Sequence, residues 1–186
     1  ARGDRISPWW KHGAVLTIIL GISGLMFMGK STYQGAPPIS GQAVTADGKT
    51  IYTGEEIMAG QTVFQKYGLM DYGSIFGHGA YRGPDFTADY LHREGVLMRE
   101  FYAGSHFQSS YAKLDQNRQA GIDKQVIVEM KQNRFESVSN QLILNPAQAD
   151  AYQKLVQHYQ DYFANANAEN PLPANYIANK EEIKNL

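Results

Sequence analysis

The sequence contains no cysteine among its 186 residues. This absence excludes disulfides, thiolate zinc sites, iron–sulfur clusters and covalently attached haem, so any metal ion must be bound by oxygen or imidazole ligands. The sequence also lacks an excess of either charge, because 17 basic residues are matched by 18 acidic ones and the net charge is −1. Without a basic surface there is no electrostatic reason to expect a nucleic-acid partner, and we exclude one.

Recognisable catalytic motifs are absent as well. The sequence has no H-x-x-x-H or H-E-x-x-H metal motif, no nucleophile elbow, no P-loop and no dinucleotide fingerprint. His78, His92 and His106 follow one another at intervals of fourteen residues, but the loop before Pro84 interrupts any continuous helix that could align them. We therefore expect no histidine cluster, and the residues by themselves name no reaction.

One long apolar run lies near the N-terminus. Residues 13–29 carry no charge, and this run of seventeen is close to the roughly 20 residues that span a membrane as a helix. Pro8 before the run is a typical helix start. Aromatic residues, which membrane interfaces favour, flank the run as Trp9, Trp10 and Tyr33. The run therefore predicts a transmembrane helix between Pro8 and Tyr33.

The basic residues around this run predict its orientation. Arg2, Arg5 and Lys11 precede it, whereas Lys30 is the only base near its other end. The positive-inside rule then places the N-terminus in the cytoplasm and the remainder of the chain outside. A cleaved signal peptide and a helix buried in a soluble core are the alternatives. The anchor is preferred because residues 26–30 offer no small-x-small cleavage site.

The rest of the chain predicts a mainly α-helical domain with one short β-hairpin. Asp47-Gly48 supplies the turn of a hairpin between residues 44 and 52, since such a dipeptide adopts the positive φ that the turn requires. Thr53 and Glu56 form a capping-box pair at the start of the next helix. Further helices are expected from Pro84 to about Ala103, from Gln119 to Phe135, from Pro146 to Phe163 and from Asn179 onward, with Leu91 and Ile127 among the residues facing the core.

These elements divide the chain into three parts. Residues 1–34 are the cytoplasmic N-terminus and transmembrane helix, residues 35–178 are the domain outside the cytoplasm, and residues 179–186 begin a further helix. Gly35-Ala36-Pro37-Pro38 marks the first boundary, because proline ends a helix and disfavours helix in the residue before it.

A glycine-rich stretch from Gly60 to Phe86 is the most unusual part of the sequence. Four glycines lie between Gly68 and Gly79. Within it, Gly77-His78-Gly79-Ala80-Tyr81 lets a main chain approach another group closely and turn its carbonyl groups toward it. Such a turn suits a cofactor or a metal ion, although a tight loop that joins two helices has the same composition.

Residues in this stretch carry a resemblance to a known family. Gly60-x-x-x-Phe64 followed by Gly77-x-Gly79-Ala80-Tyr81-x-x-Pro84-Asp85 resembles the membrane-anchored cytochrome c subunit of bacterial nitric oxide reductase. That subunit has a C-x-x-C-H haem attachment motif between the same landmarks, and its cysteines and histidine fall here on Leu69, Tyr72 and Gly73. The longer pattern GHGAYRGPDFTADYLHRE, residues 77–94, resembles the single-chain, quinol-dependent nitric oxide reductases, whose N-terminal part is a haem-free relic of that subunit.

The resemblance implies a cytochrome-c-like domain that caps the outer face of a catalytic membrane part, in the same polypeptide or in a separate subunit. That part would hold haem b, haem b3 and a non-haem iron, with none of their ligands in this chain. The resemblance also implies a calcium ion that bridges haem propionates and binds main-chain oxygens of Gly79 and Tyr81. Calcium accepts backbone carbonyls at about 2.3 to 2.6 Å, which suits a glycine-rich turn. For His78 two roles stay open, an exposed loop residue and a partner of a propionate.

The implied function is the reduction of nitric oxide to nitrous oxide and water, with electrons from membrane quinol. The implied location is the bacterial inner membrane, with lipid around the helix, the main domain on the periplasmic or extracellular side, and residues 179–186 leading into the catalytic part. A nitric oxide dismutase has an equivalent part and is one alternative. A non-catalytic, membrane-anchored adaptor with a cytochrome-like fold is the other.

Overall fold

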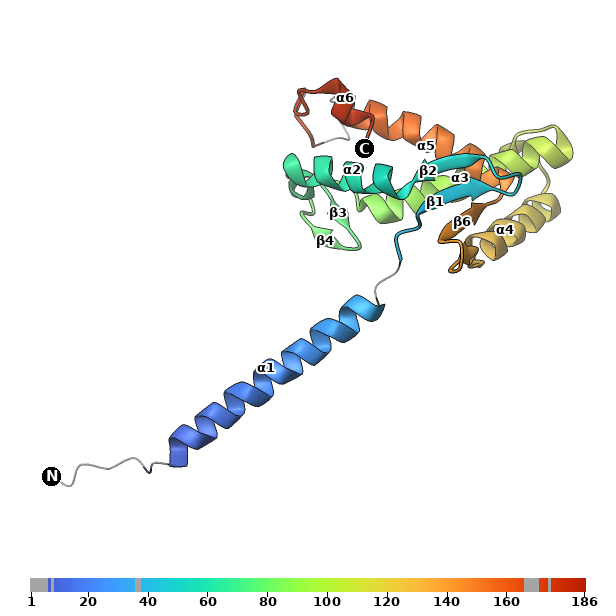
Figure 1. Ribbon diagram of the computed structural model, residues 1–186. Coiled ribbons are helices and arrows are strands. Elements are labelled where there is room, and N and C mark those ends of the chain that lie inside the picture. The colour runs from blue at the N-terminus through green and yellow to red at the C-terminus, as the bar shows by residue number, and fades with distance from the viewer. Residues whose placement is uncertain (1–6, 8, 36–37, 166–170, 174) are drawn as a thin grey trace. The chain divides into compact units, whose positions relative to one another are not determined.

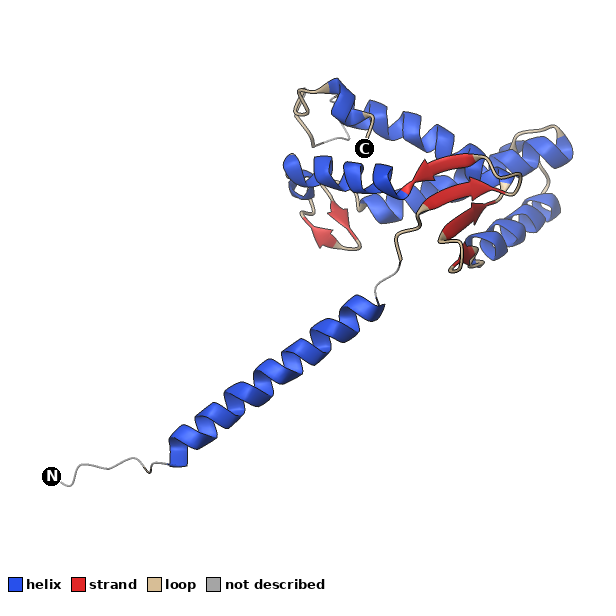
Figure 2. Ribbon diagram, viewed as in Figure 1, coloured by secondary structure: helices blue, strands red, loops and turns tan. Residues whose placement is uncertain are grey.

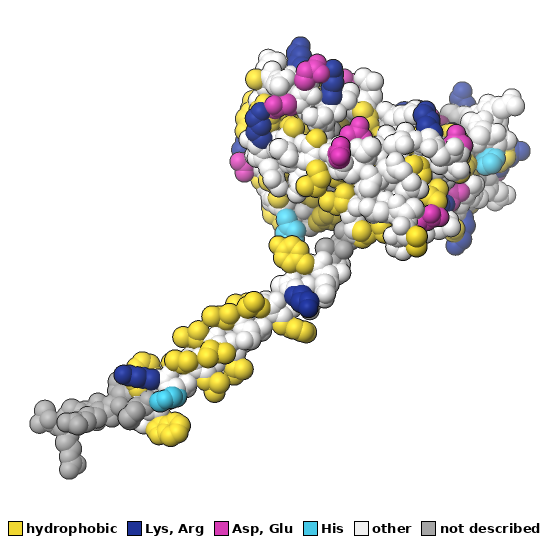
Figure 3. Space-filling view, in the orientation of Figure 1, with side chains coloured by type: hydrophobic (Ala, Val, Ile, Leu, Met, Phe, Trp, Pro, Cys, Tyr) yellow, Lys and Arg dark blue, Asp and Glu magenta, His cyan; other side chains and the backbone are white. Residues whose placement is uncertain are grey.

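A computed structural model describes residues 7, 9–35, 38–165, 171–173 and 175–186, and the chain divides into two compact units, residues 1–39 and 40–186. The first unit contains helix α1 (Trp9–Gly35), which has no buried residue and is covered mainly by hydrophobic side chains (Figures 1 and 3). Its 27 residues are long and apolar enough to cross a membrane, which is compatible with the predicted single-pass anchor. The expected helix start at Pro8 and the break at Ala36-Pro37 lie outside the described residues.

The second unit is mainly helical, as predicted (Figure 2). Its α-helices and 3-10 helices are α2 (Gly54–Lys66), η1 (Leu69–Asp71), α3 (Phe86–Phe107), η2 (Tyr111–Lys113), α4 (Gln116–Lys131), α5 (Pro146–Ala164) and α6 (Lys180–Ile183). Side-chain caps explain where they begin. The predicted capping box at α2 is present, because the Thr53 amide donates to Glu56 Oε2 at 2.7 Å and the Glu56 amide donates to Thr53 Oγ1 at 3.2 Å. Asn145 and Gln148 form a second capping box at α5.

The boundaries of two helices differ from those expected. Helix α3 continues past Ala103 to Phe107 and ends where Gln108 adopts a left-handed φ of 50°. Helix α4 begins three residues earlier than predicted, because the Asp115 side chain accepts the amide of Arg118 at 3.1 Å. It also ends at Lys131, four residues short of the expected end.

Fewer apolar residues of α3 and α4 face the core than the sequence predicts. Ile122 and Val126 of α4 are buried, whereas Ile127 is 46% exposed. Leu91 of α3 is 48% exposed. The predicted core positions of Leu91 and Ile127 are therefore wrong, because a residue next to an inward-facing one points about a quarter-turn away from the core.

A four-stranded sheet lies beside the helices, with the strand order β2-β1-β6-β5. The predicted hairpin is confirmed as β1 (Gln42–Thr45) and β2 (Thr50–Thr53), which pair antiparallel around Gly48 at a φ of 83°. Strands β5 (Phe135–Glu136) and β6 (Gln141–Leu144) complete the sheet, and β6 runs parallel to β1. The sequence pattern does not predict β5 and β6. The expected helix through Phe135 is therefore wrong, because Phe135 lies in β5.

In the described part of the second unit, two core clusters share α3 and α5, which lie side by side (Figure 1). One cluster joins α3 to α4 and the first turns of α5, around Met98, Ile122 and Val126. The other joins the last turns of α5 to η1, α6 and the start of α3, around Leu69 and Leu155, which are almost fully buried. Ile183 of α6 belongs to this second cluster, so the C-terminal segment packs on the second unit.

One carboxyl group lies in this interior. Glu94, in the middle of α3, is only 8% exposed, and burial raises its pKa above the ordinary value, although a hydrogen bond with Gln148 opposes the shift. Burial, together with the negative charge of Glu94, raises the pKa of the neighbouring Tyr90. A charged Glu94 therefore opposes the packing of α3 against α5.

Replacing Glu94 by glutamine is expected to stabilise the fold near neutral pH. The pKa of the Glu94 carboxyl is higher in the folded chain than in the unfolded chain, where it is about 4.3. Ionisation of Glu94 therefore lowers the free energy of unfolding once the pH exceeds that unfolded pKa. The melting temperature of the purified chain should rise by a few degrees at pH 7 and by much less at pH 4. Glu55→Gln, which changes an exposed carboxyl on α2, is the control. An equal rise at both pH values for Glu94→Gln would contradict the direction of the pKa shift.

Candidate functional site

The glycine-rich stretch connects α2 to α3 through a 3-10 turn and a small hairpin (Figure 1). Gly68 adopts a left-handed φ of 59° and leads into η1. Strands β3 (Ser74–Ile75) and β4 (His78–Gly79) then pair antiparallel, with Ser74 opposite Gly79. The sequence predicts only a loop here, because two-residue strands are too short to show an alternating pattern.

Asp85 is the polar centre of this segment. Its Oδ2 accepts hydrogen bonds from Ser74 Oγ at 2.7 Å and from the Gly77 amide at 2.6 Å, while its Oδ1 accepts from the Ala88 amide at 2.9 Å. These donors, the Ala88 amide foremost, hold the pKa of Asp85 below its usual range. One carboxylate thus caps α3 and closes the β3–β4 hairpin. Pro84-Asp85 predicts a helix start here, but no signal in the sequence predicts the cap by the Asp85 side chain or its bonds to the hairpin.

Two glycines are required because the main chain packs against itself. A Cβ atom on Gly73 would lie 2.4 Å from Phe86 Cε2 and 2.7 Å from the Pro84 carbonyl oxygen. A Cβ atom on Gly79 would lie 2.4 Å from the Gly73 carbonyl oxygen, and Gly79 has a φ of 142° that other residues rarely adopt. The sequence suggests that the glycine-rich main chain approaches another group closely. In the structure, that group is another backbone segment of the same chain.

Gly79 and Tyr81, the two residues expected to bind calcium, lie close together at the end of β4. Gly79 is exposed and Tyr81 is 91% exposed, while a hydrogen bond from the Ala80 amide to the Met70 carbonyl oxygen, 2.8 Å long, fixes the chain between them. Main-chain oxygens are suitable donors for a hard cation, but two of them supply only part of the six to eight ligands that calcium takes. A calcium ion at this turn thus requires further oxygen ligands from outside it.

The surroundings of the turn offer few such ligands. Among the residues that the structure describes, no group of three or more His, Asp or Glu side chains is placed to hold a metal ion. His78 is exposed on β4, and His92 and His106 lie on α3.

Bulky side chains fill the space behind the turn. Leu69 is fully buried in the second core cluster, and the Tyr72 ring packs against the ring of Tyr176, with centroids 5.0 Å apart. Phe86, which lies against Gly73, makes edge contacts with Phe64 at a centroid distance of 5.8 Å and further ring contacts with α5. The interior side of the turn is therefore aromatic and aliphatic.

Comparison with known protein families gives a match over most of the chain. Residues 40–186 match the family of the NorB cytochrome c-like domain, which is a domain of nitric oxide reductase. The matched region is the second unit, including the whole glycine-rich stretch. A comparison with curated proteins finds no match.

Replacing Gly79 by alanine should lower the free energy of unfolding more than replacing Gly77 does, although both glycines have positive φ values. At Gly77 a Cβ atom would meet nothing within 4 Å, so Gly77→Ala should cost only the backbone strain, about 1 kcal/mol. At Gly79 the overlap with the Gly73 oxygen adds to the strain, and the cost should exceed about 3 kcal/mol. Equilibrium unfolding of the two variants measures both values. Equal costs would show that the turn relaxes freely and that the packing at Gly79 is unimportant.

Proposed function

The chain belongs to the family of the NorB cytochrome c-like domain of nitric oxide reductase, and from this premise we propose that it is the N-terminal, membrane-anchored part of a quinol-dependent nitric oxide reductase. The enzyme converts two nitric oxide molecules, two protons and two electrons into nitrous oxide and water. The observation that carries the proposal is the family match over residues 40–186, which includes the motif of residues 77–94. The catalytic centre, with haem b, haem b3 and a non-haem iron, lies in the partner part.

The chain itself is proposed to hold no haem. The sequence has no cysteine for covalent attachment. Further support comes from two of the three positions that align with the attachment motif. Leu69 is part of the packed core, and at Gly73 the ring of Phe86 and the Pro84 carbonyl group occupy the space that a histidine side chain needs. A soluble cytochrome then has no haem in this chain to reduce, which favours membrane quinol as the electron donor.

The role proposed for this chain is structural. The turn around Gly79 and Tyr81 contributes main-chain oxygens to a calcium ion whose remaining ligands, including haem propionates, come from the catalytic part. Calcium would neutralise the propionate carboxylates at the junction. Support comes from the exposure of both residues and from the rigidity that Asp85 and the Ala80 amide give to the turn. A turn that is already ordered loses little conformational entropy when it binds.

The proposed location follows from α1 and the charges around it. Helix α1 anchors the chain in a bacterial inner membrane, with the N-terminus in the cytoplasm and the second unit on the periplasmic or extracellular side. Residues 179–186 lead toward the catalytic membrane part. A nitric oxide dismutase with the same domain and a non-catalytic adaptor are distinguished from this function by the experiment that follows.

Purification in mild detergent should yield a stable complex that contains haem b and reduces nitric oxide with quinol. Metal analysis should find calcium, and removal of calcium with a chelator should lower both the thermal stability of the complex and its haem absorption, with recovery when calcium is returned. A haem-free monomer would support the adaptor, and release of oxygen from nitric oxide would support the dismutase. A complex that is active but never contains calcium would rule out the roles of Gly79 and Tyr81 while leaving the reductase assignment intact.

Restoring the attachment motif should not restore a haem. The triple variant Leu69→Cys, Tyr72→Cys, Gly73→His places the attachment residues in sequence, but the new imidazole overlaps Phe86 and Pro84. Expression together with a cytochrome c maturation system should give no covalent haem on this chain and a marked loss of folded protein. The double variant without Gly73→His should fold better, because it adds nothing at the crowded position. A covalent haem with an ordinary absorption spectrum in the triple variant would refute the proposed filling of the site.

A further inference from the structure

An apolar pocket of about 280 Å³ lies where α2, β3, α3 and α5 meet the C-terminal segment. The residues that line it are Phe64, Ile75, Phe86, Thr87, Tyr90, Tyr159, Phe163 and Leu186. None of these described residues has a charged side chain. The one aliphatic hydroxyl, on Thr87, already accepts a hydrogen bond from the Phe76 amide at 3.2 Å. The pocket therefore presents carbon surface almost throughout.

Aromatic side chains form much of this lining. The rings of Tyr90 and Tyr159 are nearly parallel, at 13° with centroids 6.5 Å apart, and the rings of Tyr159 and Phe163 are inclined by only 29°. The hydroxyl group of Tyr159 is engaged, since it donates to Asp89 Oδ2 at 2.9 Å. A flat molecule packs against aromatic side chains better than a branched one does, because aromatic rings prefer offset stacking and edge-to-face contacts.

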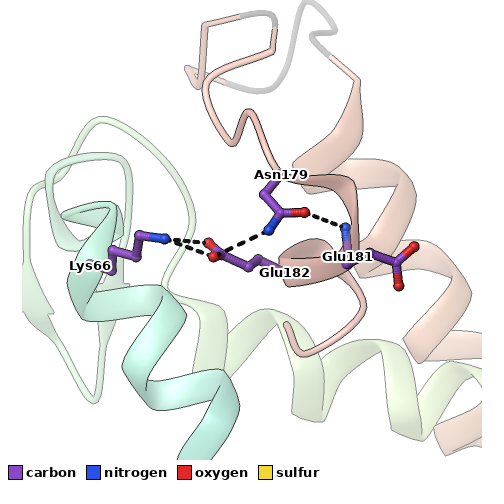
Figure 4. A network of polar contacts seen from close by, with 4 residues as sticks. All are labelled: Lys66, Asn179, Glu181 and Glu182. Carbon is purple, nitrogen blue, oxygen red and sulfur yellow. Dashed lines mark hydrogen bonds and ion pairs between the residues drawn. The ribbon is translucent and has the colours of Figure 1, made fainter.

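The C-terminal segment, residues 175–186, holds one wall in place. Lys66 Nζ on α2 donates to both oxygens of Glu182 at 2.7 and 2.9 Å, and Figure 4 shows Asn179 on the other side of the same carboxylate. The backbones also meet, because a Cβ atom on Gly60 of α2 would lie 2.4 Å from the Asn185 carbonyl oxygen. Leu186 follows directly and lines the pocket.

We propose that this pocket is a binding site for one uncharged, flat molecule of one or two fused rings. A dry apolar cavity of about 150 Å³ is known to take benzene, so about 280 Å³ has room for a single ring or a bicyclic one. An anionic ligand is disfavoured, because the aromatic and aliphatic lining offers no cationic partner for it. Neither Gly79 nor Tyr81 lines the pocket, and the site does not depend on the proposed reductase function.

Site-directed labelling tests the proposal in membranes that contain the complete protein. Because this chain has no cysteine, Thr87→Cys places a single thiol of the chain in the pocket, and Ala88→Cys places one on the exposed surface next to it. Each variant is treated with uncharged benzyl methanethiosulfonate or with its anionic sulfonatoethyl analogue. Mass spectrometry of the peptide from this chain measures the labelling rates, independently of nitric oxide turnover.

The preference for the benzyl reagent over the charged one should be at least about tenfold greater at Thr87→Cys than at Ala88→Cys, because only the first thiol lies in apolar surroundings. Toluene should slow benzyl labelling at Thr87→Cys and leave Ala88→Cys unchanged. Equal preferences at the two positions, or no protection by toluene, would overturn the proposal. If Thr87→Cys does not accumulate, Ile75→Cys, on the wall that β3 provides, is subject to the same two criteria.

Discussion

The hydrogen bonds that converge on the Asp85 carboxylate are the constraint on which the glycine-rich segment depends. Strands β3 and β4 have only two residue pairs, and such a short hairpin is not stable by itself in water. Asp85 ties it to the first turn of α3 through the Ser74 hydroxyl and the Gly77 amide. Helix α3 is held in turn by packing against α4 and α5. The exposed turn therefore takes its position from the core of the second unit.

This arrangement changes the interpretation of the glycine-rich composition. From composition alone, a glycine-rich turn favours close contact with a ligand, and the structure places the contact inside the chain, where Gly79 meets the backbone of Gly73. The two interpretations are compatible, because they concern opposite sides of the same turn. The inner side packs without side chains, and the outer side leaves Gly79 and Tyr81 exposed. The internal packing is what would give a bound ion a fixed set of main-chain oxygens.

The parts of the fold that sequence predicts are those set by local chemistry. Thr53 with Glu56, Asp85 after Pro84, and Asn145 before Pro146 each mark a helix start through a side-chain cap. The pairing of β1 with β6 joins segments about a hundred residues apart, and local periodicity contains no information on it. In the site, the sequence indicated the turn and a helix start at Pro84-Asp85. It held no sign that the Phe86 ring lies against Gly73, because that contact depends on the path of the whole turn.

The aromatic interior behind the turn explains why a pocket persists there. In the proposed function this region corresponds to the haem site of the cytochrome c subunit, and side chains then have to fill the large flat volume that a haem would occupy. Leu69 and Phe86 fill the part next to the turn. Aromatic rings are rigid and turn about only two torsions, so they cannot collapse into the remaining space as flexible side chains do. The aromatic residues of α3 and α5 that line this space also belong to the cluster that packs the two helices together, and Leu186 lines it as well.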